Sequence, residues 1–239
     1  MEGNAFREIP SSIVRGGAEG IIEFLFKRIE QTEPIVDQTF NQEVTDLGNF
    51  CNRGLIKIPE IPDSLKELNC DKNSITSIGH IIANKGSSLR VMSLNNNNIH
   101  DLGNNWALLK LEILKVSGNK LEKVDLGDLA NLSNLRELDL SFNKIEKVKC
   151  SKVIASLLSL NLENNKINDI SELTVKSLPC LNSLMIANNN LVRISPEIGA
   201  WPSLKALSLH GNPLKTLPQH IIQKGTAAVK SALRERLGN

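Results

Sequence analysis

Apolar and polar residues alternate in short runs along most of the chain, and an asparagine follows each run. In "LRELDLSFNKIEKV" the leucines around the LDL core recur with a period of two, which predicts a short strand with its leucines on one side. Seven segments share the pattern LxxLxLxxNxLxxL, with Met, Val, Ile or Cys at some apolar places. Their asparagines, 24, 22, 24, 22, 24 and 23 residues apart, are Asn73, Asn97, Asn119, Asn143, Asn165, Asn189 and Asn212.

This pattern is the leucine-rich repeat. One repeat cannot bury its apolar side alone, so stacked copies share a continuous core. We therefore expect an α/β fold, a leucine-rich-repeat solenoid (horseshoe) with a parallel sheet on the concave face and a C-terminal capping helix. An asparagine amide both donates and accepts, so each repeated asparagine is predicted to be structural and to bond its own turn and the next coil, as one rung of a ladder.

The segments between the strands differ in character. "GHIIANKGSS", "LGDLANLSN" and "SELTVKSLPC" are compatible with helical or 3₁₀ turns, whereas "EIPDS" before Leu65 is too short and proline-bound for a helix. From Leu47 to Ile58 we expect an incomplete coil with a strand only. There Arg53 occupies the place of the ladder asparagine.

After Asn212 the pattern changes to that of a cap. Thr226 is the predicted N-cap of a helix whose buried stripe contains Val229, Leu233 and Leu237. The charged run 234–236 is expected to face water.

The opening segment, Gly3 to Ile29, copies the closing one, Gly211 to Leu237. We predict that residues 1–30 are the tail and capping helix of an upstream array, and that 31–43 form a linker. Residues 44–218 are then the repeat array, with about seven full repeats and one incomplete coil, and 219–239 are the C-terminal cap. The alternative is that Met1 is native and the copy serves as an N-terminal cap.

The ending "GNPLKTLPQHIIQKGTAAVKSALRERL", with "LVRISPEIGAWPSLKALSLHGNPL" upstream, resembles the C-terminal half of the leucine-rich repeat-containing protein 40 family. The first module departs from it, with "IVRGGAEG" where the second has "IIQKGTAA". The resemblance implies an intracellular, non-enzymatic interaction protein, and it supplies no catalytic residue.

Charge and cysteine content narrow the partners. The 28 basic and 26 acidic residues are mixed along the chain, and no apolar run reaches 18 residues, so we expect neither a nucleic-acid nor a membrane partner. The four cysteines, Cys51, Cys70, Cys150 and Cys180, form no CxxC pair, which argues against zinc or a disulfide scaffold. We expect each to be a buried, reduced thiol, and the protein to be cytoplasmic or nuclear.

Strand residues that point away from the core form the expected protein-binding face. Most are small or polar, but Val91, Ile113 and Met185 are apolar there, with Phe142 beside them. The full predicted partner-binding set is Val91, Asn95, Ile113, Lys115, Glu137, Asp139, Phe142, Asn161, Glu163 and Met185. An apolar centre ringed by charges is typical of a binding hot spot.

Catalysis within the chain is not expected. The four histidines, His80, His100, His210 and His220, lie in different coils, and no phosphate-loop, dinucleotide, zinc-protease or nucleophile-elbow motif occurs. A leucine-packed core offers no ligand pocket, so no cofactor or small-molecule substrate is predicted. The alternative function is recognition or regulation within a larger signalling protein or enzyme whose other domains lie upstream.

Overall fold

The computed structural model describes residues 47–79, 87–104 and 106–237. The chain divides into two units, Met1–Glu43 and Val44–Asn239, and all described residues belong to the second. The predictions for residues 1–30 and 31–43 therefore lie outside the described residues.

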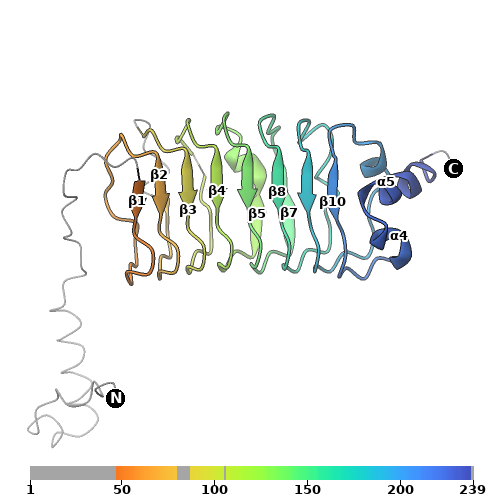
Figure 1. The fold of residues 1–239 in the computed structure, drawn as a ribbon, viewed down its shortest axis with the longest axis horizontal. Coiled ribbons are helices and arrows are strands. Elements are labelled where there is room, and N and C mark those ends of the chain that lie inside the picture. Colours follow the sequence, from red (N-terminus) through yellow and green to blue (C-terminus); the bar gives the residue numbers. More distant parts are fainter. Residues whose placement is uncertain (1–46, 80–86, 105, 238–239) are drawn as a thin grey trace, which may run out of the picture. The chain divides into compact units, whose positions relative to one another are not determined.

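Eight short parallel strands stack into one sheet, in the order β1-β2-β3-β4-β6-β8-β9-β10 (Figure 1). Equivalent residues of neighbouring repeats are in register, as where Leu114 pairs with Leu138. The strands are β1 (Leu47–Asn49), β2 (Glu67–Asn69), β3 (Val91–Ser93), β4 (Ile113–Lys115), β6 (Glu137–Asp139), β8 (Ser159–Asn161), β9 (Ser183–Met185) and β10 (Ala206–Ser208). The described part is thus a parallel-sheet solenoid of about seven turns, as the repeat predicted.

The alternation of the strands places their leucines in the core. The middle residue of every strand in this sheet is buried, and its two neighbours are more exposed. Trp106 and Trp201, both outside regular strands, also pack into the core, each with 1% of its surface exposed. The core is therefore continuous along the array.

The opposite, convex side has structure that the sequence pattern did not reveal. Two further strands, β5 (Lys123–Asp125) and β7 (Lys147–Lys149), pair in parallel there. A 3₁₀ turn, η2 (Leu126–Leu129), lies within the segment "LGDLANLSN", as expected, and a second, η3 (Pro196–Ala200), was not predicted. The segment "SELTVKSLPC" forms turns without a helix, and most of "GHIIANKGSS" lies outside the described residues.

Polar side chains cap the chain where it turns onto the convex side. The Asp125 carboxylate accepts from the Gly127 N–H at 2.9 Å, and Asp101 and Asp169 do the same for the residue two positions on. Lys149, the equivalent residue of the next coil, cannot accept a hydrogen bond. In the Lys149 coil, the Ser151 N–H instead donates to the Asp125 carboxylate of the preceding coil, at 3.0 Å.

These hydrogen bonds shift the ionisation of Asp125. Burial alone would raise the pKa of its carboxyl, but the hydrogen bonds from Ser151 and Gly127, with the nearby Lys149 charge, outweigh burial and lower the pKa below its usual value. Asp125 therefore serves two coils as a carboxylate.

Two helices close the array, α4 (Gln219–Gln223) and α5 (Thr226–Arg234), seen at the right of Figure 1. The prediction for this cap was partly wrong. Gly225, at φ 87°, is the N-cap residue of α5, and Thr226 is its first helical residue. Val229 and Leu233 are buried as expected, but the helix ends at Arg234 and leaves Leu237 48% exposed.

The charged end of α5 is also closer to the array than expected. The Arg234 Nε–H donates to the Gly199 carbonyl at 2.8 Å, so this guanidinium does not simply face water. Gly199 is required at this contact, because an added Cβ would lie 2.8 Å from the Lys230 carbonyl oxygen and from the Arg234 nitrogen.

Candidate functional site

The repeated asparagines connect each coil to the one before it. The Asn143 Nδ2 group donates to the carbonyls of Leu140 and Ser141 in its own turn, at 3.1 and 3.0 Å, and to Val116 of the preceding coil at 3.0 Å. Its Oδ1 accepts from the Leu121 N–H, again of the preceding coil, at 3.1 Å. The second coil that each asparagine serves is thus the preceding one, and our expectation of the next coil was wrong.

The same pattern runs through all seven repeats. Each side chain donates to two carbonyls of its own turn and one of the preceding coil, and accepts from that coil. Asn73 also covers the incomplete first coil, where its Oδ1 accepts from the N–H groups of Arg53 and Leu55, both at 3.0 Å. The first coil therefore does not need an asparagine at Arg53 to satisfy these groups.

Three rows of side chains cross the sheet on its solvent side, and each row contains one residue from each repeat. The first row is Glu67, Val91, Ile113, Glu137, Ser159, Ser183 and Ala206. The middle row is Asn69, Ser93, Lys115, Asp139, Asn161, Met185 and Ser208. The last row, just after the strands, is Asp71, Asn95, Ser117, Ser141, Glu163, Ala187 and His210.

Several predicted binding residues are already occupied by hydrogen bonds within the array. The Asp139 carboxylate accepts from the Ser141 N–H at 3.0 Å, and the Asn161 amide oxygen accepts from the Glu163 N–H at 3.0 Å. Asn95 accepts from the Ser117 N–H of the next coil at 2.8 Å. These side chains close local turns, so replacing them changes stability as well as surface chemistry.

Asp71 and Asn95 anchor a network at the start of the last row. The Asp71 carboxylate accepts from the Ser93 hydroxyl and the Asn95 N–H, both at 2.7 Å. Further along, the hydroxyls of Ser117 and Ser141 lie 2.9 Å apart. Hydrogen bonds therefore link four successive coils on this side of the sheet.

A second network joins Glu163, Ser208 and His210 at the other end. The Ser208 hydroxyl donates to Glu163 Oε1 at 3.0 Å and lies 3.1 Å from His210 Nδ1. Glu163 reaches a residue two coils away because the coil between them has the small Ala187 in the last row. In a nucleophilic triad the histidine stands between serine and carboxylate, whereas here the serine does, so its proton is held by the carboxylate.

The first half of the face contains charged side chains that have no partner among the described residues. Val91 and Ile113 are register partners on β3 and β4, and both are half-buried. Glu137 follows Ile113 in the same row, and Lys115 lies beside it in the middle row. Among the described residues, neither Glu137 nor Lys115 has a side-chain hydrogen bond or ion pair.

The remaining apolar members of the predicted set lie elsewhere. Met185, in the middle row of β9, is three strands from Ile113, about 14 Å at a strand spacing near 4.8 Å. Phe142 belongs to none of the three rows, because it follows the last row at the turn before Asn143. The structure thus brings together Val91, Ile113, Lys115 and Glu137, and not the whole predicted group.

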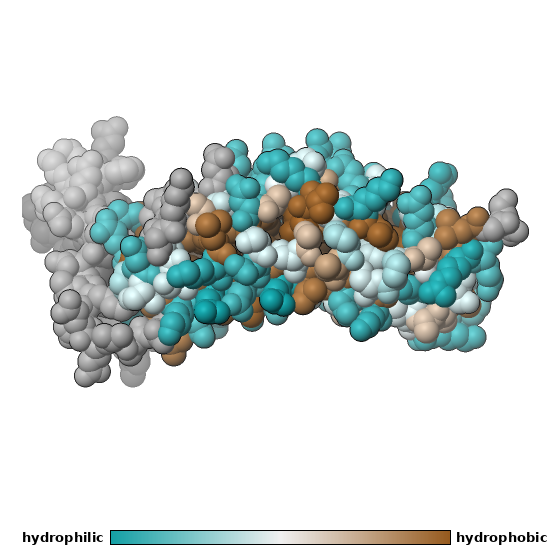
Figure 2. Space-filling view, turned by 90° about the horizontal axis from the view of Figure 1, so that it is seen from above, coloured by the Kyte–Doolittle hydropathy of each residue, from teal (hydrophilic) through white to brown (hydrophobic). Residues whose placement is uncertain are grey.

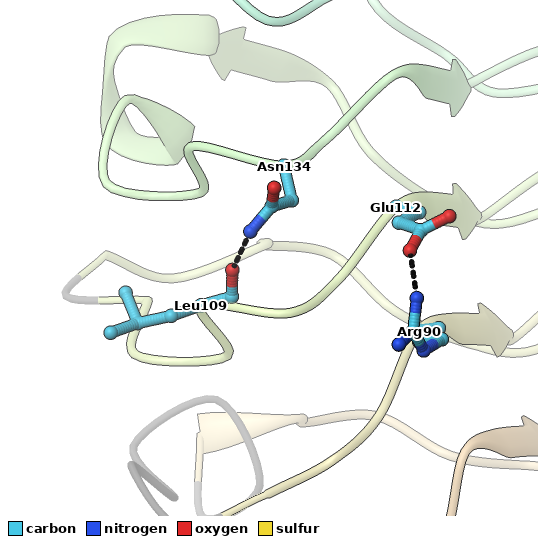
Figure 3. A network of polar contacts seen from close by, with 4 residues as sticks. All are labelled: Arg90, Leu109, Glu112 and Asn134. Atoms are coloured by element: carbon cyan, nitrogen blue, oxygen red, sulfur yellow. Dashed lines mark hydrogen bonds and ion pairs between the residues drawn. The ribbon is translucent and has the colours of Figure 1, made fainter.

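The edge at the amino ends of the strands has contacts of its own (Figure 3). Arg90 and Glu112 form an ion pair at 2.6 Å between neighbouring coils. Asn134 Nδ2 donates to the Leu109 carbonyl of the preceding coil at 2.6 Å, and the Ser203 hydroxyl donates likewise to Pro179 at 2.9 Å. Asn134 and Ser203 each lie three positions before a strand, and this second recurring polar position was not recognised in the sequence.

The edge of the array seen in Figure 2 is mostly hydrophilic, with apolar residues exposed near its middle.

The prediction of four buried thiols was only partly right. Cys70 is buried, whereas Cys180 is exposed. Burial of the Cys70 thiol, and then the charges of Asp71 and Cys51, raise its pKa to about 12.

Within the described ranges, no cluster of three metal-ligating side chains occurs, and no helix is long and apolar enough to cross a membrane.

Known proteins carry the same repeat. A model of the family described as "Leucine rich repeat" matches residues 155–214, and another with the same description matches 134–153. This chain carries leucine-rich repeats. Proteins of this kind are generally non-enzymatic scaffolds, and the fold commonly mediates protein–protein interaction.

Solved structures of leucine-rich repeat proteins show the same architecture. An internalin (inlF) from Listeria monocytogenes str. 4b F2365 is 29% identical over 67% of this chain and 46% of its own, with a TM-score of 0.54. YopM, a leucine-rich effector protein from Yersinia pestis, is 28% identical over 72% and 45%, with a TM-score of 0.56.

A third structure, of TLR13 in complex with ssRNA13, is 28% identical over 69% of this chain and 24% of its own, with a TM-score of 0.58. The matched part therefore spans less than half the length of each of these three proteins.

Proposed function

We propose that this protein is a non-enzymatic scaffold that binds another protein on the concave face of its repeat array. The observation that carries the proposal is the first half of that face. There Val91 and Ile113 place two aliphatic side chains side by side. Next to them are the charges of Lys115 and Glu137, which form no ion pair with any described residue. Apolar contact area bordered by charges that fix orientation is the composition of a protein-binding hot spot.

The rest of the predicted set takes a smaller part in this proposal. Asn95, Asp139, Asn161 and Glu163 are hydrogen-bonded within the array, and their contribution to a partner is therefore indirect: they hold the sheet surface in a fixed shape. A preformed surface loses little conformational entropy on binding. Met185 offers a separate apolar contact at the far end of the face.

We further propose that the partner is a protein and not a nucleic acid, a membrane or a small molecule, because the acidic and basic residues are mixed along the chain. No cofactor enters the proposed function. Cytoplasmic or nuclear location, and the finer resemblance to the leucine-rich repeat-containing protein 40 family, remain predictions from the sequence.

A second candidate is a recognition part of a larger signalling protein or enzyme. It is supported by the similarity of Gly3–Ile29 to Gly211–Leu237, which is the module that closes an array here. Both candidates place partner binding on the same face, so one experiment addresses that face for both.

The test is affinity capture from cell lysate with the wild-type chain and two variants, read by mass spectrometry. Ile113→Thr/Glu137→Lys alters the free part of the face and keeps a β-branched residue in β4. Glu60→Lys makes the same charge change at an exposed residue outside the three rows and serves as the control.

We expect to find a protein that is captured by the wild type and by Glu60→Lys but not by Ile113→Thr/Glu137→Lys. Equal capture of the same proteins by the wild type and both variants would contradict binding on the concave face. Asp139 is left unchanged, because replacing it would also remove the hydrogen bond to the Ser141 N–H.

A further inference from the structure

The turn that leaves each strand of the main sheet passes through a residue with left-handed backbone. In the described coils these residues, each just before the ladder position, are Asn52, Lys72, Asn96, Gly118, Phe142, Asn164, Asn188 and Gly211. Glycine suits this conformation because it has no Cβ to approach the backbone, and asparagine suits it because its short polar side chain can hydrogen-bond locally. Phe142, at φ 53°, is the one aromatic residue among them.

No contact within the described array compensates for the left-handed backbone at Phe142. The Phe142 side chain is 62% exposed, so little of its ring is buried. Its neighbours in the column have partners: Asn188 Nδ2 donates to Asn164 Oδ1 at 3.1 Å, and the Asn96 amide lies where a side chain on Gly118 would be. A bulky residue held in a strained conformation without burial points to a role outside the fold.

Lysines occupy one position just after this turn in three successive coils. Lys144 lies two residues after Phe142, and Lys120 and Lys166 occupy the same place in the coils on either side. All three are exposed, and none forms an ion pair with a described residue. Like charges stacked about 5 Å apart repel one another, and an anionic partner relieves that repulsion.

We propose that Phe142 and the lysine column Lys120, Lys144 and Lys166 form a second docking surface, at the turn edge, for an acidic protein segment with an apolar side chain. The apolar side chain packs on the ring, and the carboxylates meet the lysines. A nucleic acid fits less well, because Glu122 and Glu146, two residues after Lys120 and Lys144, interrupt the basic surface. A phosphate backbone carries a charge on every unit and cannot avoid them, whereas a peptide can place its carboxylates at the lysines alone. This surface is independent of the concave-face proposal.

The first test measures stability. Phe142→Asn places a residue suited to left-handed backbone and removes the ring, so the thermal midpoint should rise by about 1–4 °C. Val153→Asn, which replaces another apolar side chain with 57% exposure at ordinary backbone, is the control and should give no rise. A lower midpoint for Phe142→Asn would show that the ring supports the fold, and would overturn the proposal.

The second test measures binding by fluorescence anisotropy. The probe is a labelled 14-residue peptide of alternating glutamate and leucine, compared with its lysine–leucine counterpart and a labelled single-stranded oligo(dT). We expect binding of the glutamate peptide only, weakened about fivefold by Phe142→Asn and about tenfold by Lys120→Gln/Lys144→Gln/Lys166→Gln.

A triple change of equal charge elsewhere, Lys176→Gln/Lys205→Gln/Lys224→Gln, should alter binding less than twofold by comparison, because exposed charges beyond the screening distance contribute little. Equal weakening by the two triple variants would show that the net charge of the protein, and not the lysine column, causes the effect, and would overturn the proposal. Binding of oligo(dT) that is lost with the first triple variant would assign the surface to nucleic acid, and would also overturn it.

Discussion

The interior of the array and its C-terminal end satisfy the outward-facing backbone groups of a coil in different ways and at different positions. In the interior, each coil receives hydrogen bonds from the asparagine of the coil that follows, as Val116 and Leu121 do from Asn143. In the described residues, no ladder asparagine follows Asn212 to serve the last coil. There the Thr226 hydroxyl accepts from the Leu207 N–H at 2.9 Å and donates to the Leu207 carbonyl at 3.3 Å, at the free edge of β10.

A lysine completes the closure. The Lys230 ammonium, on a side chain that is 8% exposed, donates to the carbonyls of Trp201 and Leu204, both at 2.6 Å. Burial, and then the nearby Arg234 charge, lowers the pKa of this lysine. The comparison teaches that a solenoid interior uses one device many times, whereas an end needs residues that occur once.

The largest effect is expected in the ladder. Asn143→Ala removes three donated hydrogen bonds and one accepted one from buried groups, so the free energy of unfolding should fall by about 3 kcal/mol. Urea denaturation measures it. Asn190→Ala, at an exposed asparagine next to the ladder whose amide makes one long contact, is the control and should change little. Comparable losses would contradict a special role for the ladder.

The second largest loss of stability is expected where α5 packs on Gly199. Gly199→Ala puts a Cβ 2.8 Å from the helix backbone, and the resulting displacement should cost about 2 kcal/mol in urea denaturation. At Gly79 an added Cβ would meet nothing closer than 3.8 Å, so Gly79→Ala is the matched control. A Gly199→Ala protein as stable as wild type would mean that the cap shifts without loss.

Removal of the buried ammonium should have a smaller effect. Lys230→Met keeps the packing and leaves two carbonyls unsatisfied, so stability at pH 7 should fall by about 1–2 kcal/mol. Unchanged stability would show that water replaces the ammonium at both carbonyls.

The same variant gives a pH test. Because the folded pKa lies below the unfolded value near 10.4, the unfolded chain binds more protons between the two values. Stability of the wild type relative to Lys230→Met should therefore increase as the pH rises through that window, and stay constant below it. A difference that shrinks with rising pH would reverse the assigned direction.

The smallest effect is expected at the strand edge. Thr226→Val keeps the shape of the side chain and removes the hydroxyl from Leu207, which should cost about 1 kcal/mol in thermal or urea unfolding. Thr226→Ser retains the hydroxyl and should recover most of that loss. If serine and valine are equally destabilising, the methyl group, and not the hydroxyl, is what matters.

Repetition explains which parts of the fold the sequence predicted well. The strand positions and the asparagines recur at nearly constant spacing, so each repeat supports the assignment of the others, and the seven repeat strands lie where the alternation placed them. β5 and β7 escaped notice because only two coils pair there. A three-residue strand carries a weak period-two signal by itself, and at these positions repetition along the chain does not reinforce it.

The candidate site was predicted less completely, for a physical reason. The position of Val91 and Ile113 on one row follows from register, which the repeat determines. The hydrogen bond between Glu163 and Ser208 spans 45 residues and depends on the small Ala187 between them, so no local pattern reports it.

The sequence by itself determined the repeat, the direction of each strand's side chains and the ladder, because these depend on spacing within and between coils. Only the tertiary structure decided which polar side chains are free on the concave face, that Phe142 stands exposed on left-handed backbone, and how Thr226 and Lys230 close the last coil. Those outcomes depend on which backbone groups lack a partner once the coils stack, and stacking is a property of the assembled array.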